Sequence, residues 1–163
     1  MNPLTLDRLR EVLSYDSDTG AFTWLKSRGR AGAGSVAGSI GRIGYRYIHV
    51  DDRSYFAHRL AWLYTHGRWP DDEIDHVNGA YDDNRLANLR EATHAENARN
   101  KRKPSTNRSG AKGVSRHRTG RWQAFIGIGG EMNYLGLFDT VEAASAAYET
   151  AATSLFGRFK RAA

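Results

Sequence analysis

The chain contains 163 residues, 40% of them hydrophobic and 26% charged, which supports one ordinary domain or two small ones and excludes wholesale disorder. It contains no cysteine, which excludes disulfides, thiol nucleophiles and cysteine-ligated zinc, so any metal has to be bound by His, Asp, Glu or Asn. No stretch approaches the roughly 20 apolar residues of a membrane span, and the first residues do not resemble a signal peptide, so we expect a cytoplasmic protein.

Positive charge is concentrated in the last third of the chain. Residues 1–100 contain 13 basic and 14 acidic side chains, whereas residues 101–163 contain 11 and 4. The segment from Lys101 to Arg121 has eight basic residues and no acidic one. This asymmetry predicts a near-neutral working domain followed by a domain that binds nucleic acid, although a solvated run of charge explains the basic segment alone equally well.

The N-terminal part is predicted to contain short elements joined by turns. Apolar spacing predicts a helix over 6–13, capped by Thr5, and a strand over 21–25. Residues 28–44 are rich in glycine and include three arginines, so we expect a mobile loop, either solvated or in contact with phosphate. A hairpin over 44–57 and a helix from His58 to Gly67 are predicted next.

The central part reads as strand, loop, strand and helix. Residues 73–77 form an apolar strand pattern that ends at the turn signal Asn78-Gly79. A polar loop leads to a second strand over 88–91, and the capping-box spacing of Thr93 and Glu96 predicts a helix from about His94 to Lys101.

The C-terminal part is predicted to be a small sheet followed by a helix. A linker over 104–110 precedes three antiparallel strands over 112–117, 121–128 and 133–138. The last helix is expected to be capped by Asp139 and ended by Gly157. Alternation in the middle strand predicts that one face meets this helix and the other stays open; the expected helix-facing residues are Trp122, Ala124, Ile126 and Ile128.

Polar side chains that could perform chemistry are densest between Asp75 and Asn100. The triplet 82–84 reads as ordinary turn and cap residues. Asp75 and His76 differ, because a carboxylate beside an imidazole at the end of an apolar strand costs desolvation energy. In a regular strand the two side chains point to opposite faces, so one site can use both only if the strand bends or ends there.

Several motifs in this region resemble HNH endonucleases of the phage and intron-homing type. They are His58-Arg59-Leu60, Ile74 to Gly79, Asp83 to Leu89, and Glu96-Asn97, in that order. The resemblance covers roughly residues 44–102, implies a ββα-metal fold, and corresponds to the H-N-N variant of the motif.

The resemblance assigns a role to each matching position. It implies that Asp75 and Asn97 bind one divalent cation, that His76 is the general base, and that Asn88 braces the loop which orients the base. Oxygen ligands suit Mg²⁺ or Mn²⁺, and two protein ligands imply weak metal binding without DNA. His58 also matches a recurrent position, where a catalytic and a structural role both stay open.

The C-terminal part resembles the AP-two (Apetala/ethylene-response-factor) DNA-binding domain over about 107–157. The matching motifs are Lys112-Gly113-Val114, Arg121 to Ala124, Tyr134-Leu135-Gly136, and the segment from Phe138 to Tyr148. This resemblance implies a three-stranded sheet whose open face enters the DNA major groove. By family position, the residues facing DNA are Lys112, Ser115, Arg116, Gln123 and Tyr134, with Arg118 and Arg121 near phosphates. A packing role for Tyr134 is equally open.

We therefore predict an α+β protein with two domains. A metal-dependent HNH endonuclease domain spans residues 1–103, with its core motif at 44–102 and an extension at 1–43; a linker spans 104–110, and an AP-two-like domain spans 111–163. The expected substrate is double-stranded DNA, which a monomer is expected to nick; a dimer on DNA is the alternative. By resemblance, we expect a phage-encoded protein in the cytoplasm of a bacterial host. The rivals are a catalytically inactive regulatory or architectural DNA-binding protein and an RNA-binding protein.

Overall fold

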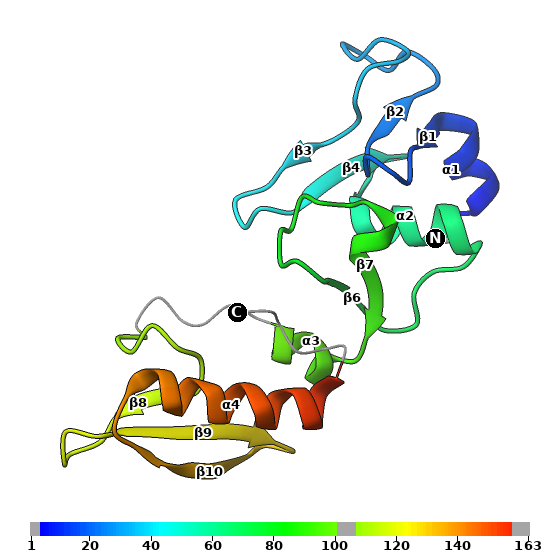
Figure 1. Ribbon diagram of the computed structural model, residues 1–163. Helices are drawn as coiled ribbons and strands as arrows, with labels where there is room; N and C mark the ends of the chain where they lie inside the picture. Colours follow the sequence, from blue (N-terminus) through cyan, green and yellow to red (C-terminus); the bar gives the residue numbers. More distant parts are fainter. Residues whose placement is uncertain (1–3, 101–106, 158–163) are drawn as a thin grey trace. The chain divides into compact units, whose positions relative to one another are not determined.

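The computed structural model describes residues 4–100 and 107–157, which divide into two compact units (Figure 1). The first comprises Met1–Ala98 and the second Arg99–Ala163. Both combine short helices with small antiparallel sheets, so the predicted α+β class is confirmed. Within the described residues, no helix is both long and apolar enough to span a bilayer.

The first unit begins with a capped helix and a short hairpin. Helix α1 (Leu6–Val12) starts at Thr5, whose side chain accepts a hydrogen bond from the Arg8 amide, as predicted. Strand β1 (Leu13–Tyr15) follows at once and pairs with β2 (Phe22–Trp24). The helix ends one residue before the predicted position because Leu13 adopts an extended conformation and pairs with Trp24.

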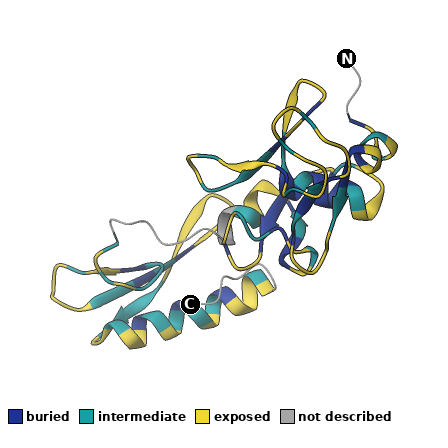
Figure 2. Cartoon of the chain, turned by 90° about the horizontal axis from the view of Figure 1, so that it is seen from above, coloured by how far each residue is buried: buried dark blue, intermediate teal, exposed yellow. Residues whose placement is uncertain are grey.

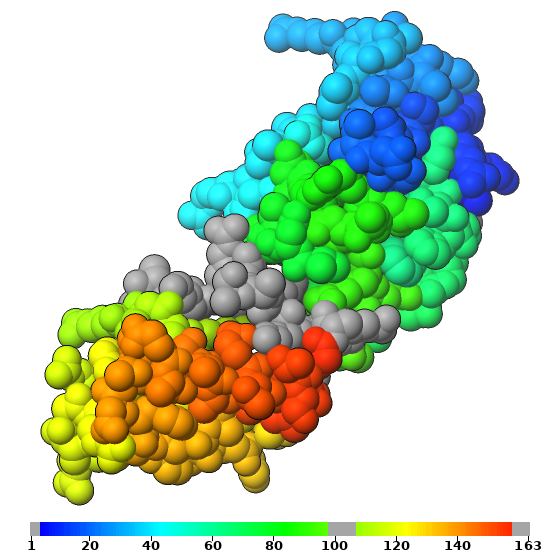
Figure 3. All heavy atoms as spheres, viewed as in Figure 1, coloured from blue at the N-terminus to red at the C-terminus, as the bar shows by residue number. Residues whose placement is uncertain are grey.

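A three-stranded sheet with the order β3-β4-β5 comes next, formed by β3 (Ser39–Ile40), β4 (Arg46–Val50) and β5 (Arg53–Phe56). The β4–β5 hairpin was predicted, and its turn has positive φ at Asp51 and Asp52. The prediction of an irregular loop over 28–44 is wrong for β3, which pairs with β4. The segment between β2 and β3, light blue in Figure 3, projects at the edge of the unit.

Helix α2 (Ala57–His66) lies at the centre of the first core. Its buried side chains, among them Leu60 and Leu63, pack in one cluster with Leu9, Phe22 and Ile48. Figure 2 shows this buried region in dark blue. The helix ends at Gly67, which adopts the left-handed conformation with φ 74°, as its position after the apolar pattern predicts.

The rest of the first unit is the predicted strand, loop, strand and helix. Strand β6 (Glu73–His76) pairs with β7 (Leu89–Ala92), and a 3₁₀ helix (Leu86–Asn88) precedes β7. Helix α3 (His94–Asn100) follows; the Thr93 amide donates to the Glu96 carboxylate, and the Glu96 amide donates to the Thr93 hydroxyl. The predicted capping box is confirmed. Lys101, the predicted last helical residue, lies outside the described residues.

The second unit is a three-stranded sheet covered on one face by a helix (Figure 1). Its strands are β8 (Val114–Arg116), β9 (Trp122–Ile128) and β10 (Glu131–Phe138), in the order β10-β9-β8, and its helix is α4 (Val141–Phe156). Ala124 and Ile126 pack under the helix, which confirms the predicted division of faces, although Ile128 is exposed.

The cap of α4 differs from the prediction. Thr140, not Asp139, is the N-cap, and its hydroxyl accepts a hydrogen bond from the Ala143 amide. Asp139 instead pairs with Arg121, with 2.7 Å between the carboxylate and Nε. Both residue types cap helices well, so the sequence alone did not discriminate between adjacent candidates. The helix ends at Gly157 as predicted. Residues 104–106 of the predicted linker lie outside the described residues.

Candidate nuclease site

The site residues are positioned by the β6–β7 hairpin and α3. In this hairpin Asp75 lies opposite Arg90, and His76 lies opposite Leu89. Because successive strand side chains point to opposite faces, Glu73 and Asp75 share one face of β6 and His76 points to the other. Asp75 and His76 are almost completely buried, with 3% and 2% of their surface exposed.

Helix α3 lies against the face of β6 that includes Asp75. The side-chain amide Nδ2 of Asn97 donates a hydrogen bond of 2.5 Å to Oε2 of Glu73, and Nδ1 of His94 lies 2.7 Å from Oε1 of the same carboxylate. Since Glu73 and Asp75 are two residues apart on β6, Asn97 and Asp75 are on the same side of the hairpin. The hydrogen bond to Glu73 thus holds the Asn97 side chain at this face of β6.

Asp75 is paired with Arg90 from the neighbouring strand. Nε and Nη2 of Arg90 lie 2.8 Å and 2.5 Å from Oδ2 of Asp75. The guanidinium compensates the buried carboxylate, which otherwise costs several kcal/mol to desolvate. Neither Arg90 nor Glu73 was singled out from the sequence, because which residue faces Asp75 depends on the register of the hairpin.

The donor chemistry on this face fits a hard divalent cation. Within residues 4–100 and 107–157, no three His, Asp or Glu side chains form a cluster that could hold a metal ion. Glu73 shares this face of β6 with Asp75, and its carboxylate is hydrogen-bonded to the amide of Asn97; carboxylate and amide oxygens suit Mg²⁺ or Mn²⁺. Because Arg90 occupies the Asp75 carboxylate, a cation has to compete with this guanidinium.

His76 lies in an aromatic pocket on the opposite face of β6. Its ring is 5.0 Å from the ring of His58 in an edge-to-face arrangement, and 5.8 Å and 6.2 Å from the rings of Tyr45 and Tyr81. Burial lowers the pKa of His76 below its ordinary value, although the contact of Nε2 with Oδ1 of Asn84, at 3.5 Å, and nearby carboxylates oppose this shift. His76 is therefore neutral, and able to accept a proton, at pH 7.

Two tyrosines cover His76 from the outside. Tyr45 and Tyr81 stack with 4.5 Å between ring centroids and 19° between planes, and both rings contact the His76 ring. Beside them, Arg46 of β4 forms two hydrogen bonds of 2.8 Å and 2.9 Å with Asp82. The loop after β6 is thereby fastened to β4, and the stacked tyrosines stay over the imidazole.

Asn88 spans the loop that follows His76. Its Oδ1 accepts from the amide of Asn78 at 3.0 Å, and its Nδ2 donates to the carbonyl of Asp83 at 2.8 Å. The Asp83 carboxylate in turn accepts from the Asn78 side chain and from Arg85, and the Arg85 guanidinium is the main reason that the pKa of Asp83 falls to about 2. Asn88 thus connects the start of this loop, at Asn78, with Asp83.

His58 is buried beside His76 without a polar partner for one of its nitrogens. Only 7% of the residue is exposed, and Nδ1 has no hydrogen bond. Burial lowers the pKa of His58 to about 3, with smaller contributions from His76 and Arg59. An imidazole that stays neutral in contact with three aromatic rings is suited to packing, and it restricts the orientations open to His76.

In the second unit, three of the predicted DNA-facing residues share the open face of the sheet. Ser115 pairs with Gln123, whose Nε2 donates to the Ser115 hydroxyl at 3.1 Å. Tyr134 is 58% exposed, and its ring is 5.2 Å from that of Phe125. Tyr134 therefore packs and is accessible at the same time.

The predicted basic residues of this unit are distributed differently. Arg116 is opposite Trp122 in the register, so it points to the helix-covered face, and its guanidinium lies over the Trp122 ring. Arg121 is paired with Asp139, whereas Arg118 is exposed in the turn between β8 and β9. Lys112 is partly buried and precedes β8. The open face itself is thus mostly uncharged.

A comparison with known families identifies part of the first unit. A family model described as HNH endonuclease matches residues 55–99, less than a third of the chain. The matched segment includes the β6–β7 hairpin, α3 up to Arg99 and all four predicted residues of the nuclease site, and it ends before the sheet of the second unit. No solved structure matches the chain. The chain is thus similar to HNH endonucleases over residues 55–99, which indicates a nuclease that acts on DNA.

Proposed function

We propose that the protein is a metal-dependent endonuclease that nicks double-stranded DNA, with a site preference and of the phage or homing type. In this proposal Asp75 and Asn97 bind one Mg²⁺ or Mn²⁺ ion, and His76, at which β6 ends, serves the same site as the general base. Asn88 holds the loop that orients His76. The observation that supports the proposal most is the hydrogen bond from Asn97 to Glu73, because it fixes the amide on the Asp75 face of β6. The match over residues 55–99 supports the reaction class.

The proposed reaction is hydrolysis of a phosphodiester by an activated water. When bound, the cation supplies charge stabilisation for the phosphorane and for the leaving 3′ oxygen. With Nε2–H directed at Oδ1 of Asn84, Nδ1 of neutral His76 takes the proton from the attacking water. Asn88 keeps the loop after His76 closed through its contacts with Asn78 and Asp83, which maintains the orientation of the ring.

The burial of His76 imposes one requirement on this mechanism. With 2% of its surface exposed beneath Tyr45 and Tyr81, the imidazole reaches a water only after the stacked tyrosines separate. Tyr81 is 40% exposed and belongs to a loop, so it is the ring that moves more easily. Contact with DNA is the natural trigger, because nucleobases and sugars offer the tyrosine an alternative stacking surface.

The second unit is proposed to bind the same DNA through the open face of its sheet. Ser115, Gln123 and Tyr134 present two hydrogen-bonding groups and a phenol on one accessible surface, the composition expected of a surface that reads base edges. A two- or three-stranded ribbon fits the major groove, which is about 12 Å wide. The AP-two resemblance leads to the same assignment.

A catalytically inactive DNA-binding protein is the second candidate. The observation that favours it is the pairing of Asp75 with Arg90, since an ion-paired carboxylate binds a cation less readily. Burial of His76 has the same implication. In that case the first unit serves as a DNA-binding element and the second unit provides the affinity.

Nicking of a supercoiled plasmid separates the two candidates. The active protein converts supercoiled DNA to open circles with Mg²⁺ or Mn²⁺, and His76→Ala lowers the rate by at least about 100-fold. The matched control is His49→Ala, which alters an exposed histidine on β4 whose Nδ1 lies 3.3 Å from the Ser54 hydroxyl. Equal rates for wild type and His76→Ala contradict the mechanism. Binding of duplex DNA without nicking supports the inactive candidate, and equal affinity for RNA contradicts both.

A further inference from the structure

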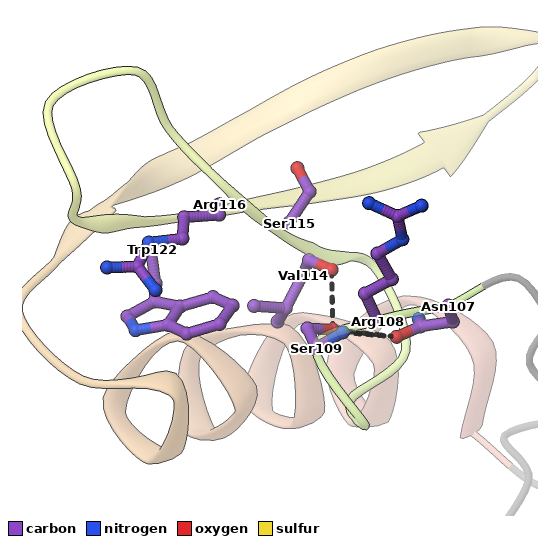
Figure 4. Close-up of a pocket in the computed structure, with 7 residues that line it drawn as sticks. All are labelled: Asn107, Arg108, Ser109, Val114, Ser115, Arg116 and Trp122. Atoms are coloured by element: carbon purple, nitrogen blue, oxygen red, sulfur yellow. Dashed lines mark hydrogen bonds between the residues drawn. The ribbon is translucent and has the colours of Figure 1, made fainter.

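A groove borders β8, the edge strand of the sheet in the second unit. It has a volume of about 660 Å³ and is lined by residues 107–109, by β8 and by Trp122 (Figure 4). Arg108 and Arg116 lie at its two ends, with Val114 between them. The AP-two resemblance implies DNA contact for Arg116 on the open face and no role for Arg108, so this groove has no assignment.

The wall of the groove is held in place by a compact hydrogen-bonded turn. The hydroxyl of Ser109 lies 2.7 Å from the carbonyl of Val114 and 2.8 Å from Oδ1 of Asn107, and Nδ2 of Asn107 donates to the carbonyl of Ala111. Residues 107–111 are therefore fastened to β8, and Arg108 projects from a fixed backbone. The two ends of the groove keep a constant separation.

The groove contains two guanidinium groups and no carboxylate. Among the residues that the structure describes, neither Arg108 nor Arg116 forms an ion pair, in contrast to Arg121, which is paired with Asp139. The Arg116 guanidinium lies 5.6 Å from the centroid of the Trp122 ring, which restricts its movement while leaving its N–H groups available. Guanidinium groups prefer oxyanions with several acceptor oxygens, and phosphate is such an anion.

We propose that this groove binds a backbone phosphate of the DNA strand that borders the major groove occupied by the open face. The proposal rests on the proposed DNA-binding role of that face. Strands are spaced about 4.8 Å apart, so a three-stranded sheet is about 10 Å across, comparable to the major-groove width of about 12 Å. A phosphate backbone therefore passes each edge of the inserted sheet, and β8 is an edge strand. Arg108 and Arg116 contact the phosphate, and Trp122 contacts the adjoining sugar.

The test is the salt dependence of duplex binding by the full chain. For Arg108→Gln/Arg116→Gln, which removes the contact with one phosphate, the slope of log Kd against log salt decreases by about 1, and affinity falls about tenfold at physiological salt, equally for every duplex sequence. Arg108→Lys/Arg116→Lys restores the slope, because the charge is retained. An unchanged slope in the glutamine variant overturns the proposal. Melting curves of each variant show that the unit remains folded.

A second variant separates this proposal from the proposed function. Gln123→Ala changes the open face and leaves every residue that lines the groove in place, so it reduces the preference among duplex sequences without changing the salt slope. One outcome is that this variant binds every duplex as the wild type does, while the arginine variant has a smaller salt slope. In that case the groove binds phosphate but the open face does not read DNA, and the placement of the groove beside the major groove is overturned. If neither variant changes binding, both proposals are wrong.

Discussion

Arg90 and Asp75 form a buried ion pair across the β6–β7 hairpin, with Nε and Nη2 of the arginine at 2.8 Å and 2.5 Å from one carboxylate oxygen. The pair has two consequences. It stabilises a carboxylate whose burial is otherwise unfavourable. It also means that a metal cation has to compete with the Arg90 guanidinium for the Asp75 carboxylate. Metal binding and the stability of the hairpin are therefore opposed at this residue.

Replacement of Arg90 by alanine should separate these two effects. Arg90→Ala leaves the 3%-exposed Asp75 carboxylate without its main cation, so the free energy of unfolding decreases by about 3 kcal/mol. The same variant binds Mn²⁺ more tightly, and added Mn²⁺ recovers part of the lost stability. Urea denaturation with and without Mn²⁺ measures both effects.

The matched control is Arg85→Ala. Arg85 also pairs with a carboxylate, that of Asp83, but its own side chain is 53% exposed. Solvent screens an exposed pair, so Arg85→Ala loses little stability. If Arg90→Ala lowers the free energy of unfolding no more than Arg85→Ala does, the Asp75–Arg90 pair has no special role in stability. If Mn²⁺ does not rescue Arg90→Ala, Asp75 is not a ligand.

His58 predicts a pH dependence of stability. Its pKa is about 3 in the folded protein against an ordinary value of 6.5, so the unfolded chain binds one more proton in the interval between them. Stability contributed by neutral His58 is complete above pH 6.5 and decreases as the pH falls towards 3, by at most about 1.4 kcal/mol per pH unit. His76, Arg59 and Tyr45 are the titratable or charged groups that face the ring, and His76 contributes in the same direction.

The variant His58→Phe isolates this contribution. Phenylalanine retains the ring contacts with Tyr45 and Phe56 and removes the unpaired Nδ1, so the protein keeps its stability at pH 7 and loses less of it between pH 6.5 and 5. Denaturant midpoints measured at several pH values for both proteins give the difference directly. Parallel pH profiles show that His58 is not a buried neutral group.

Asn88 should be required for both stability and nicking. Asn88→Ala removes two hydrogen bonds and leaves the Asn78 amide and the Asp83 carbonyl without their partner, which costs about 2 kcal/mol. Nicking decreases further than the loss of folded protein explains, because the loop after His76 loses its brace. The control Asn133→Ala affects an exposed asparagine and costs less than about 0.5 kcal/mol. A stable but inactive Asn88 variant still supports the bracing role, whereas a fully active one contradicts it.

Gly113 is the glycine on which the second unit depends most. A Cβ at this position overlaps the Tyr148 ring and lies 2.5 Å from the Phe125 carbonyl oxygen, and φ is +71°. Gly113→Ala is therefore expected to destabilise the second unit by about 3 kcal/mol or more. Gly110→Ala has a similar φ of +77° but open space around the Cβ, so it costs about 1 kcal/mol. Thermal unfolding and duplex affinity are measured for both variants. If Gly113→Ala and Gly110→Ala lower the stability equally, Tyr148 is not packed tightly against position 113.

Elements with strong local signals were predictable from the sequence. The Thr5 cap of α1, the Thr93–Glu96 capping box of α3 and the glycine that ends α2 each satisfy backbone groups within a few residues, so the chain records them locally. Strand β3 was missed because Ser39 and Ile40 are both exposed and have no alternation; the strand exists only through its pairing with β4.

The candidate site was predictable only in part, for a related reason. The polar residues ending β6 stand out in an apolar strand, and the motif order indicates their roles. Glu73 holds Asn97, and this contact depends on where α3 is placed against the hairpin. Arg90 holds Asp75, and this contact depends on the register of the hairpin. The burial of His76 beneath Tyr45 and Tyr81 likewise depends on how the β4 sheet meets the loop after β6.

The most direct measurement is anomalous diffraction from crystals of the protein bound to duplex DNA and Mn²⁺. The account predicts one manganese peak with an Asp75 oxygen and the Asn97 amide oxygen each at about 2.2 Å, a DNA phosphate beside it, and Arg90 rotated away from the carboxylate. A manganese ion bound elsewhere, or an Asp75–Arg90 pair that persists in the DNA complex while nicking proceeds, contradicts it.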